Sequence, residues 1–267
     1  MSRYRLLPSP AQQGMLRDHC SHARYVWNLA VEQHSHWRPG RAKAPGYLEQ
    51  CRQLTALRAE SDWLAAGSQM VHQQALRDFA HAMTAFFDPK NAARRPCWRK
   101  AGRDEGFRIV ALKPEHVRRL NRKSGEVWIP KVGWVRFRWS RAVPDGVKSY
   151  RVTLDRAGRW HVAFAAIPLP VPTPGNGLVV GIDRGVKVSA ALSTGDRLRV
   201  PGLSWRERGR LQRLERKLAR AKKGSARRGQ VKLGIARLRA RETDRRKDWV
   251  EKTTTDIARG FDVIKVE

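Results

Sequence analysis

Residues 177–185 read GLVVGIDRG, and this stretch decides the fold of the C-terminal third. Residues 178–182 form a continuous apolar run, which is the pattern of a strand buried on both faces. Asp183 ends the run, where an unpaired carboxylate would be costly, and Gly181 and Gly185 would let a backbone or a ligand approach closely. This segment alone leaves two interpretations open: a turn aspartate at a strand end, or an acid that binds a metal ion.

The elements that follow favour the metal-binding interpretation. Alternating apolar residues over 188–192 and 198–200, with a turn at 193–196, predict a three-strand meander. Helices come next, and the sequence closes on a strand that ends in Glu267. This is the ribonuclease-H-like order, in which the first and fourth strands lie side by side. We therefore expect Asp183 and Glu267 to be catalytic carboxylates that share Mg²⁺.

A competing interpretation is the actin-like sugar kinases and chaperone ATPases, which also contain a GIDxG stretch. In those proteins a hydroxyl residue usually follows to meet phosphate, whereas Val186 and Lys187 follow here, and no second glycine-rich phosphate loop occurs. The charge of the chain also suits a polyanion better than a nucleotide.

Composition excludes several classes of protein. The 267 residues include 55 Lys and Arg against 24 Asp and Glu, a formal net charge of +31. A hydrophobic content of 41% with 10 Trp excludes a disordered basic tail. No membrane-length apolar run or signal-peptide core occurs, and three widely spaced Cys favour a reduced, cytoplasmic setting. The charge excess points to nucleic acid as the partner.

The strongest charge asymmetry lies in residues 206–247, with 18 Lys and Arg against four acids. Leucines recur at helical spacing, so the segment is expected to form a helical hairpin, broken near Lys223 and Gly224, with cationic outer faces. We expect it to bind phosphate backbones without sequence specificity. The candidate contacts are Arg213, Arg216, Lys217, Arg220, Lys222, Lys223, Arg227 and Arg228.

Aromatic and basic residues also interleave in the first half. Arg94, Arg95, Arg99 and Lys100 surround Trp98, and strand alternation places Arg136 and Arg138 on the face opposite Val135, Phe137 and Trp139. These cations are further candidate nucleic-acid contacts. For most of the tryptophans, packing in a core is a better interpretation than stacking on bases.

Periodicity along the rest of the chain predicts an α+β multidomain protein. Residues 4–7 form a strand, and helical patterns cover about 11–39, 47–58 and 68–87. A basic connector spans 88–106, antiparallel strands of a barrel-like sheet follow over 107–167, and residues 168–177 are a Pro/Gly-rich linker. A last helix carrying Trp249, Ile257 and Phe261 is expected before the final strand.

The chain resembles the TnpB/OrfB-type family of transposon-encoded RNA-guided nucleases, which are related to type V CRISPR effectors. Six pieces occur in the order of that family: YRLLPSPAQ, ARYVWNLAVEQ, RRPCWRK, IPKVGWVRFRW, GIDRGVKVSAALSTGD and DVIKVE.

The resemblance implies a wedge-like β-domain (residues 1–10 and 107–170), interrupted by a helical recognition insert with its basic connector (11–106). A linker (171–177) and the N-terminal part of a ribonuclease-H-like RuvC domain (178–267) follow, with the basic hairpin at 204–247. It also implies guide RNA and target DNA as partners. Asp183 and Glu267 would be the first two catalytic acids and ligands of Mg²⁺.

The sequence departs from the family pattern in three ways. Family members continue past the second acid into a CxxC…CxxC zinc ribbon and a third catalytic Asp. The usual HK pair reads Glu251-Lys252 here, and Arg184 stands where an apolar residue is common. Three expectations stay open: a fragment of a nuclease, a decayed copy, or a guide-RNA- or DNA-binding protein that does not cleave. A plain RNA-packaging protein would leave Asp183 without a role.

Overall fold

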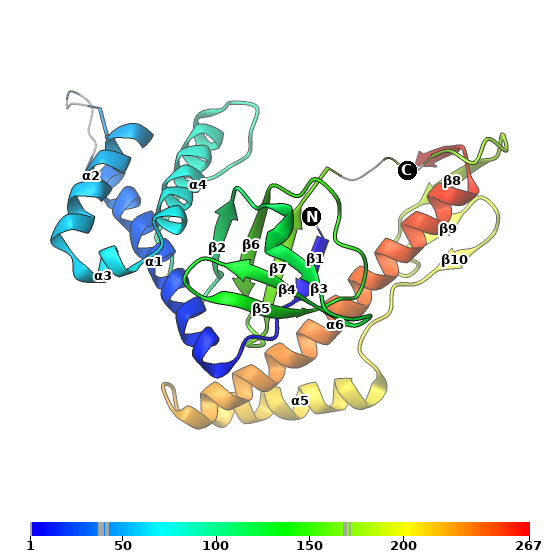
Figure 1. Cartoon of the computed structure of the whole chain (residues 1–267). Coiled ribbons are helices and arrows are strands. Elements are labelled where there is room, and N and C mark those ends of the chain that lie inside the picture. Colours follow the sequence, from blue (N-terminus) through cyan, green and yellow to red (C-terminus); the bar gives the residue numbers. More distant parts are fainter. Residues whose placement is uncertain (1, 37–39, 41–42, 168–169, 171) are drawn as a thin grey trace. The chain divides into compact units, whose positions relative to one another are not determined.

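The structure, a computed structural model, describes residues 2–36, 40, 43–167, 170 and 172–267. It is a mixed α/β protein that divides into two compact units, Met1–Ile167 and Pro168–Glu267 (Figure 1). Parts of the predicted linker, residues 168, 169 and 171, lie outside the described residues, as does Met1 of the predicted β-domain. None of the helices in the described ranges combines the length and apolarity that crossing a membrane requires.

Among its described residues, the first unit has four α-helices: α1 (Pro10–Ser35), α2 (Tyr47–Glu60), α3 (Asp62–Ala66) and α4 (Gln69–Phe87). A capping box fixes the start of α1, because the Ser9 side chain accepts from the Gln12 backbone and the Gln12 side chain accepts from the Ser9 backbone. The helical patterns over 11–39, 47–58 and 68–87 thus correspond to α1, α2 and α4, and residues 37–39 of the first pattern lie outside the described residues. Periodicity does not predict α3, since five residues are too few to show a helical period.

The strands of the first unit form two sheets. They are β1 (Ser2–Arg5), β2 (Glu105–Val110), β3 (Val117–Arg119), β4 (Ser124–Ile129), β5 (Gly133–Arg138), β6 (Ser149–Leu154) and β7 (Trp160–Ala165), with a short 3₁₀ helix at Pro114–His116. Their orders are β1-β7-β6-β2 and β3-β4-β5, and every pairing is antiparallel. One bridge between Leu6 and Phe137 connects the sheets. Among the described residues the sheets do not close into a barrel. The predicted antiparallel β-structure is confirmed, and the predicted barrel-like closure is not.

The pairing of β1 with β7 brings the first residues of the chain next to residues about 160 positions later, with Ser2 opposite Phe164. In the sequence, α1 to α4 therefore fall between two strands of one sheet, β1 and β2. Phe137 is fully buried and contacts Tyr4 and Phe164 edge-on, at ring-centroid distances of 5.4 and 5.9 Å. The predicted alternation of β5 is confirmed, because Val135 and Phe137 are buried while Arg136 and Arg138 are exposed.

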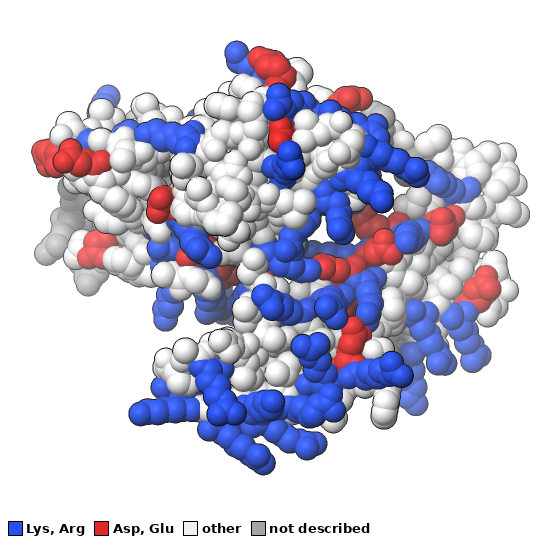
Figure 2. Space-filling view, turned by 60° about the horizontal axis from the view of Figure 1, so that its bottom comes forward, with Lys and Arg blue, Asp and Glu red and all other residues white. Residues whose placement is uncertain are grey.

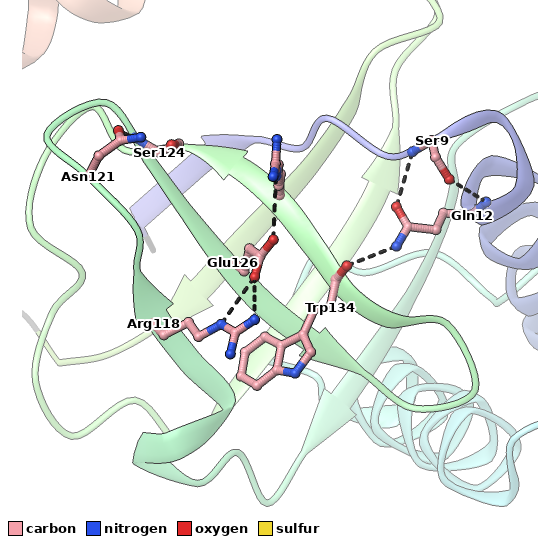
Figure 3. A network of polar contacts seen from close by, with 8 residues as sticks. Ser9, Gln12, Arg118, Asn121, Ser124, Glu126 and Trp134 are labelled. Carbon is pink, nitrogen blue, oxygen red and sulfur yellow. Dashed lines mark hydrogen bonds and ion pairs between the residues drawn. The ribbon is translucent and has the colours of Figure 1, made fainter.

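A polar network joins α1 to this β-domain (Figure 3). The Gln12 amide donates to the Trp134 backbone carbonyl at 2.8 Å, which ties the first turn of α1 to β5. The buried Glu126 carboxylate accepts two bonds from Arg118, at 2.8 and 3.1 Å, and lies 3.5 Å from Arg136 Nε. Its burial is tolerated because two guanidinium groups compensate the charge.

The described part of the second unit contains one four-stranded sheet and two helices. Its elements are β8 (Val179–Asp183), β9 (Ala190–Leu192), β10 (Arg197–Leu198), α5 (Trp205–Arg220), α6 (Ala226–Gly260) and β11 (Val263–Val266). The strand order is β10-β9-β8-β11, with β8, β9 and β10 antiparallel and β11 parallel to β8. The predicted meander and the predicted contact of the first strand with the fourth are both confirmed.

Two expectations for this unit are wrong. The second arm of the hairpin and the predicted last helix form one continuous helix, α6, because no proline or turn signal interrupts residues 226–260. The apolar run at 178–182 is not buried on both faces: Val180 is buried, whereas the Val179 side chain is 52% exposed. An apolar run is also compatible with a sheet face that the described residues leave uncovered.

Helices α5 and α6 pack along a short apolar seam in which Leu203, Leu211 and Leu238 are buried. Gly234 of α6 fits this seam closely, since a Cβ at that position would lie 3.3 Å from the Leu214 side chain. Polar contacts connect α5 and α6 at both ends of the pair. At one end Arg228 donates to the carbonyls of Leu218 and Ala221, at 2.7 and 2.8 Å.

We expect Phe137→Ala to destabilise the first unit by about 3–5 kcal/mol, because it removes a fully buried ring where the two sheets meet. Chemical denaturation that follows the unfolding of this unit measures the loss. Phe87→Ala is the control, because that ring is 70% exposed, and it should change the free energy by no more than about 0.5 kcal/mol. Equal effects of the two changes would contradict this description of the core.

The other end of the α5–α6 pair should become less stable at low pH. Glu207 forms a two-oxygen ion pair with Arg245, and hydrogen bonds from Arg245 and from the Ser204 backbone lower the pKa of Glu207 to about 2 from its ordinary 4.5. A carboxyl with a depressed folded-state pKa contributes stability above its unfolded pKa, and this is lost as the pH falls from about 4.5 towards 2. Helical circular dichroism during thermal unfolding should show this loss for the wild type but not for Glu207→Gln. Glu251→Gln, a change on the same helix pair, should keep the wild-type profile.

Candidate active site and nucleic-acid interface

Asp183 and Glu267 lie side by side at the ends of two parallel strands. Val266 of β11 is opposite Ile182 of β8, and the next backbone amide, that of Glu267, donates to the Ile182 carbonyl at 3.0 Å. Since parallel strands in this register end at the same edge of the sheet, the two acids emerge there together. They line one open pocket with Gly181, Ser193 and Lys265.

Contacts at the opposite end of the strand pair fix its register. The Asp262 carboxylate accepts hydrogen bonds from the backbone amides of Gly175 and Gly177, and the Asn176 amide donates to the Gly260 carbonyl at 2.9 Å. Gly175 and Gly177 both have positive φ, at 70° and 71°, so glycine suits this turn. Sequence reasoning missed Asp262, because no local pattern links it to a turn more than 80 residues earlier.

The chemistry of Asp183 and Glu267 fits a hard cation. Both residues are exposed, and neither side chain makes a hydrogen bond or an ion pair with the residues that the structure describes. Mg²⁺ prefers oxygen ligands and is commonly held by one or two carboxylates together with water and phosphate oxygens. No group of three or more His, Cys, Asp or Glu with metal-binding geometry occurs in the described part of the chain. These residues therefore supply two candidate carboxylate ligands.

Ser193 and Gly181 shape the floor of this pocket. The Ser193 hydroxyl accepts from the Gly181 amide at 3.0 Å, and the Ser193 amide donates to the Gly181 carbonyl at 2.9 Å. A Cβ at position 181 would lie in ordinary van der Waals contact with the Ser193 side chain, at 3.6 Å. The sequence indicates a close-approach role for Gly181 but gives no signal for its partner Ser193.

The candidate phosphate contacts on the helix pair share one arrangement. Arg213, Arg216, Lys217 and Arg220 recur at helical spacing and are all exposed, while the buried Leu211 lies on the packed side of α5. Lys222 and Lys223 in the turn and Arg227 at the start of α6 are exposed as well. Arg228 is different, because it is half-buried and bonds to the last carbonyls of α5. Figure 2 shows one face of the molecule on which Lys and Arg side chains greatly outnumber Asp and Glu.

The candidates of the first unit divide in the same way. Arg94, Arg95, Lys100 and Arg138 are exposed. Arg136 is exposed and paired with Glu126, and Arg99 stacks on the Trp27 ring at 3.6 Å from its centroid. Arg99 therefore has a packing role that its sequence context did not indicate.

Two descriptions of known families match parts of this chain. Residues 150–267 match a family described as "Probable transposase" (OrfB of the IS605 type), and residues 2–42 match its companion "Helix-turn-helix domain". The described part of that second match consists of β1 and the single helix α1.

Two curated relatives match over 99% of this chain. A "Putative RNA-guided DNA endonuclease" of Streptomyces pristinaespiralis is 31% identical, and a "Putative RNA-guided DNA endonuclease InsQ" of Escherichia coli (strain K12) is 28% identical. The chain spans 65% of the length of each relative. The matches at both ends of the chain and the two relatives agree with the resemblance of its motifs: the chain is similar to OrfB-type transposases of the IS605 kind.

Proposed function

We propose that this chain provides the guide-RNA- and DNA-binding scaffold, and two metal-binding carboxylates, of an RNA-guided, Mg²⁺-dependent DNA endonuclease of a mobile element acting in the bacterial cytoplasm. The observation that carries the proposal is the position of Asp183 and Glu267 on adjacent parallel strands, at the edge of one pocket. The names of the two relatives support it. In this proposal the first unit is the wedge domain with its helical insert, and the second unit is part of a RuvC domain.

The two acids and the basic surfaces have separate tasks. Asp183 and Glu267 would hold Mg²⁺, which when bound polarises a phosphodiester and lowers the pKa of water. The exposed cations of α5 and of the turn after it would hold the phosphate backbone by charge, leaving the sequence to be read by base pairing with a guide. Ser193 and Gly181 would line the approach to the carboxylates.

Metal binding tests the assignment without relying on cleavage. We expect Asp183→Asn and Glu267→Gln each to weaken Mn²⁺ binding, followed by electron paramagnetic resonance, by on the order of tenfold or more, because each removes one anionic ligand. Glu267→Gln keeps the size of the side chain and removes only its charge. Asp256→Asn, an exposed acid on α6, is the matched charge control and should bind Mn²⁺ like the wild type. Wild-type affinity in both site variants would refute the proposed metal site.

Salt dependence tests the basic face of α5. We expect replacement of four cations by Gln to reduce the slope of log affinity against log salt by about 3, because each lost phosphate contact removes about 0.7–0.9 from it. The four residues are Arg213, Arg216, Lys217 and Arg220. Binding of an RNA–DNA hybrid at several salt concentrations measures the slope. A control with Gln at four exposed cations of the first unit, Lys113, Arg122, Lys123 and Lys148, makes the same change in net charge. An equal change of slope in the control would show that overall charge, rather than this face, determines binding.

A second candidate is a protein that binds guide RNA or DNA without cutting. It is favoured by one observation, namely the array of exposed Lys and Arg on α5 and in the turn after it, which would serve binding with or without cleavage. Under this alternative the four-cation variant would behave as just described, whereas Mn²⁺ binding by Asp183 and Glu267 would be weak in the wild type and would not change in the variants. The metal-binding experiment therefore separates the two candidates.

A further inference from the structure

Hydrogen bonds hold the backbone on both sides of Trp98, while the Trp98 side chain is exposed. The Trp27 indole donates to the Cys97 carbonyl at 2.9 Å. On the other side, the Asn28 side chain bonds to both backbone groups of Arg99, accepting at 2.8 Å and donating at 3.1 Å. The residues on both sides of Trp98 are thus fixed to α1, yet the Trp98 side chain is 53% exposed. An exposed aromatic ring whose flanking backbone is anchored in this way is a candidate contact for a ligand.

One face of this feature is an aromatic pocket. Trp98 lines a pocket along α1 together with Tyr25 and Trp63, whose side chains are 43% and 46% exposed. The Trp63 ring is stacked on the buried His22 ring at 4.1 Å and contacts the edge of Tyr25 at 5.3 Å. Burial and the neighbouring His19 lower the pKa of His22, so a neutral ring supports Trp63. The pocket is therefore preformed, which reduces the entropy lost when a flat ligand enters.

The other face of the same tryptophan is a basic pocket. It is lined by Trp98 and by five cations, Arg94, Arg95, Arg99, Lys100 and Arg103, with Asp104 as the one acid in its lining. Arg99 is stacked on Trp27, while Arg94 and Lys100 are exposed and form no ion pair with the described residues. An aromatic pocket and a cationic pocket that share one exposed tryptophan match the two parts of a nucleotide, a flat base and a phosphate.

We propose that this pair of pockets binds an unpaired RNA nucleotide, with the base against Trp98 in the aromatic pocket and the adjacent phosphate beside Arg94 and Lys100. RNA is favoured over DNA because the aromatic pocket also contains the Glu32 carboxylate, which can only accept hydrogen bonds. The ribose 2′-hydroxyl is a donor that DNA lacks. The site rests on the proposed nucleic-acid-binding function but does not involve Asp183 or Glu267.

The test uses the full chain and an eight-nucleotide unpaired RNA with 2-aminopurine at its centre. Stacking on a tryptophan quenches this base, so quenching reports entry into the pocket. We expect Trp98→Ala to remove the quenching and to weaken binding about tenfold to a hundredfold, without changing the salt slope. Trp98→Phe should restore most of the affinity. Lys100→Gln should instead lower the salt slope by about 0.7, as expected for one lost phosphate contact on a single strand.

Two controls make the result specific. Trp205→Ala removes a ring that is 81% exposed in the second unit and should leave both readouts unchanged. Both readouts are taken without added divalent metal, so that a failure of the metal site cannot be mistaken for a failure here. Undiminished quenching and affinity in Trp98→Ala, or equal losses in Trp205→Ala, would overturn the nucleotide site. DNA of the same sequence that binds as tightly as the RNA would overturn the assignment to RNA.

Discussion

The parallel pairing of β8 with β11 is the constraint on which the second unit depends. Four residue pairs, from Val263–Val179 to Val266–Ile182, bring together segments more than 80 positions apart. At one end the Asp262 carboxylate and two glycine amides fix the register, and at the other end the two acids emerge. A shift by one residue would turn alternate side chains to the other face and separate Asp183 from Glu267. The candidate metal site is thus a product of strand register rather than of contacts between the acids themselves.

The sequence predicts this pairing because the relevant signals are local and strong. The apolar run before Asp183, the alternating strands after it and the terminal apolar strand each identify an element, and the ribonuclease-H-like order supplies their arrangement. Burial is harder to predict, since an apolar run is the same whether or not something covers it: Val179 and Val266 are 52% and 62% exposed. The length of α6 escapes prediction for a similar reason. Helical periodicity identifies a helix, but whether two helical stretches join depends on the residues between them.

Side-chain roles are less predictable than elements. Alternation on β5 places Arg136 and Arg138 outside correctly, yet nothing in the sequence indicates that Arg136 is paired with the buried Glu126. Charge alone makes Arg228 and Arg99 candidate phosphate contacts, whereas the structure gives them structural partners, two helix carbonyls and the Trp27 ring. The expectation that most tryptophans pack in the core fails for Trp98. Its exposure follows from hydrogen bonds to α1, about 70 residues earlier, which no local pattern shows.

Helix α6 has a mechanical consequence. Its 35 residues span about 52 Å at about 1.5 Å per residue, and β11 begins three residues after the helix ends. The helix therefore connects the basic turn at one end with the strand that leads to Glu267 at the other, without a break. At this length a tilt of about one degree moves the far end by about 1 Å, the order of displacement that matters for metal coordination and for catalysis. A displacement of the turn would be carried along this one continuous helix towards the strand that leads to the Glu267 carboxylate.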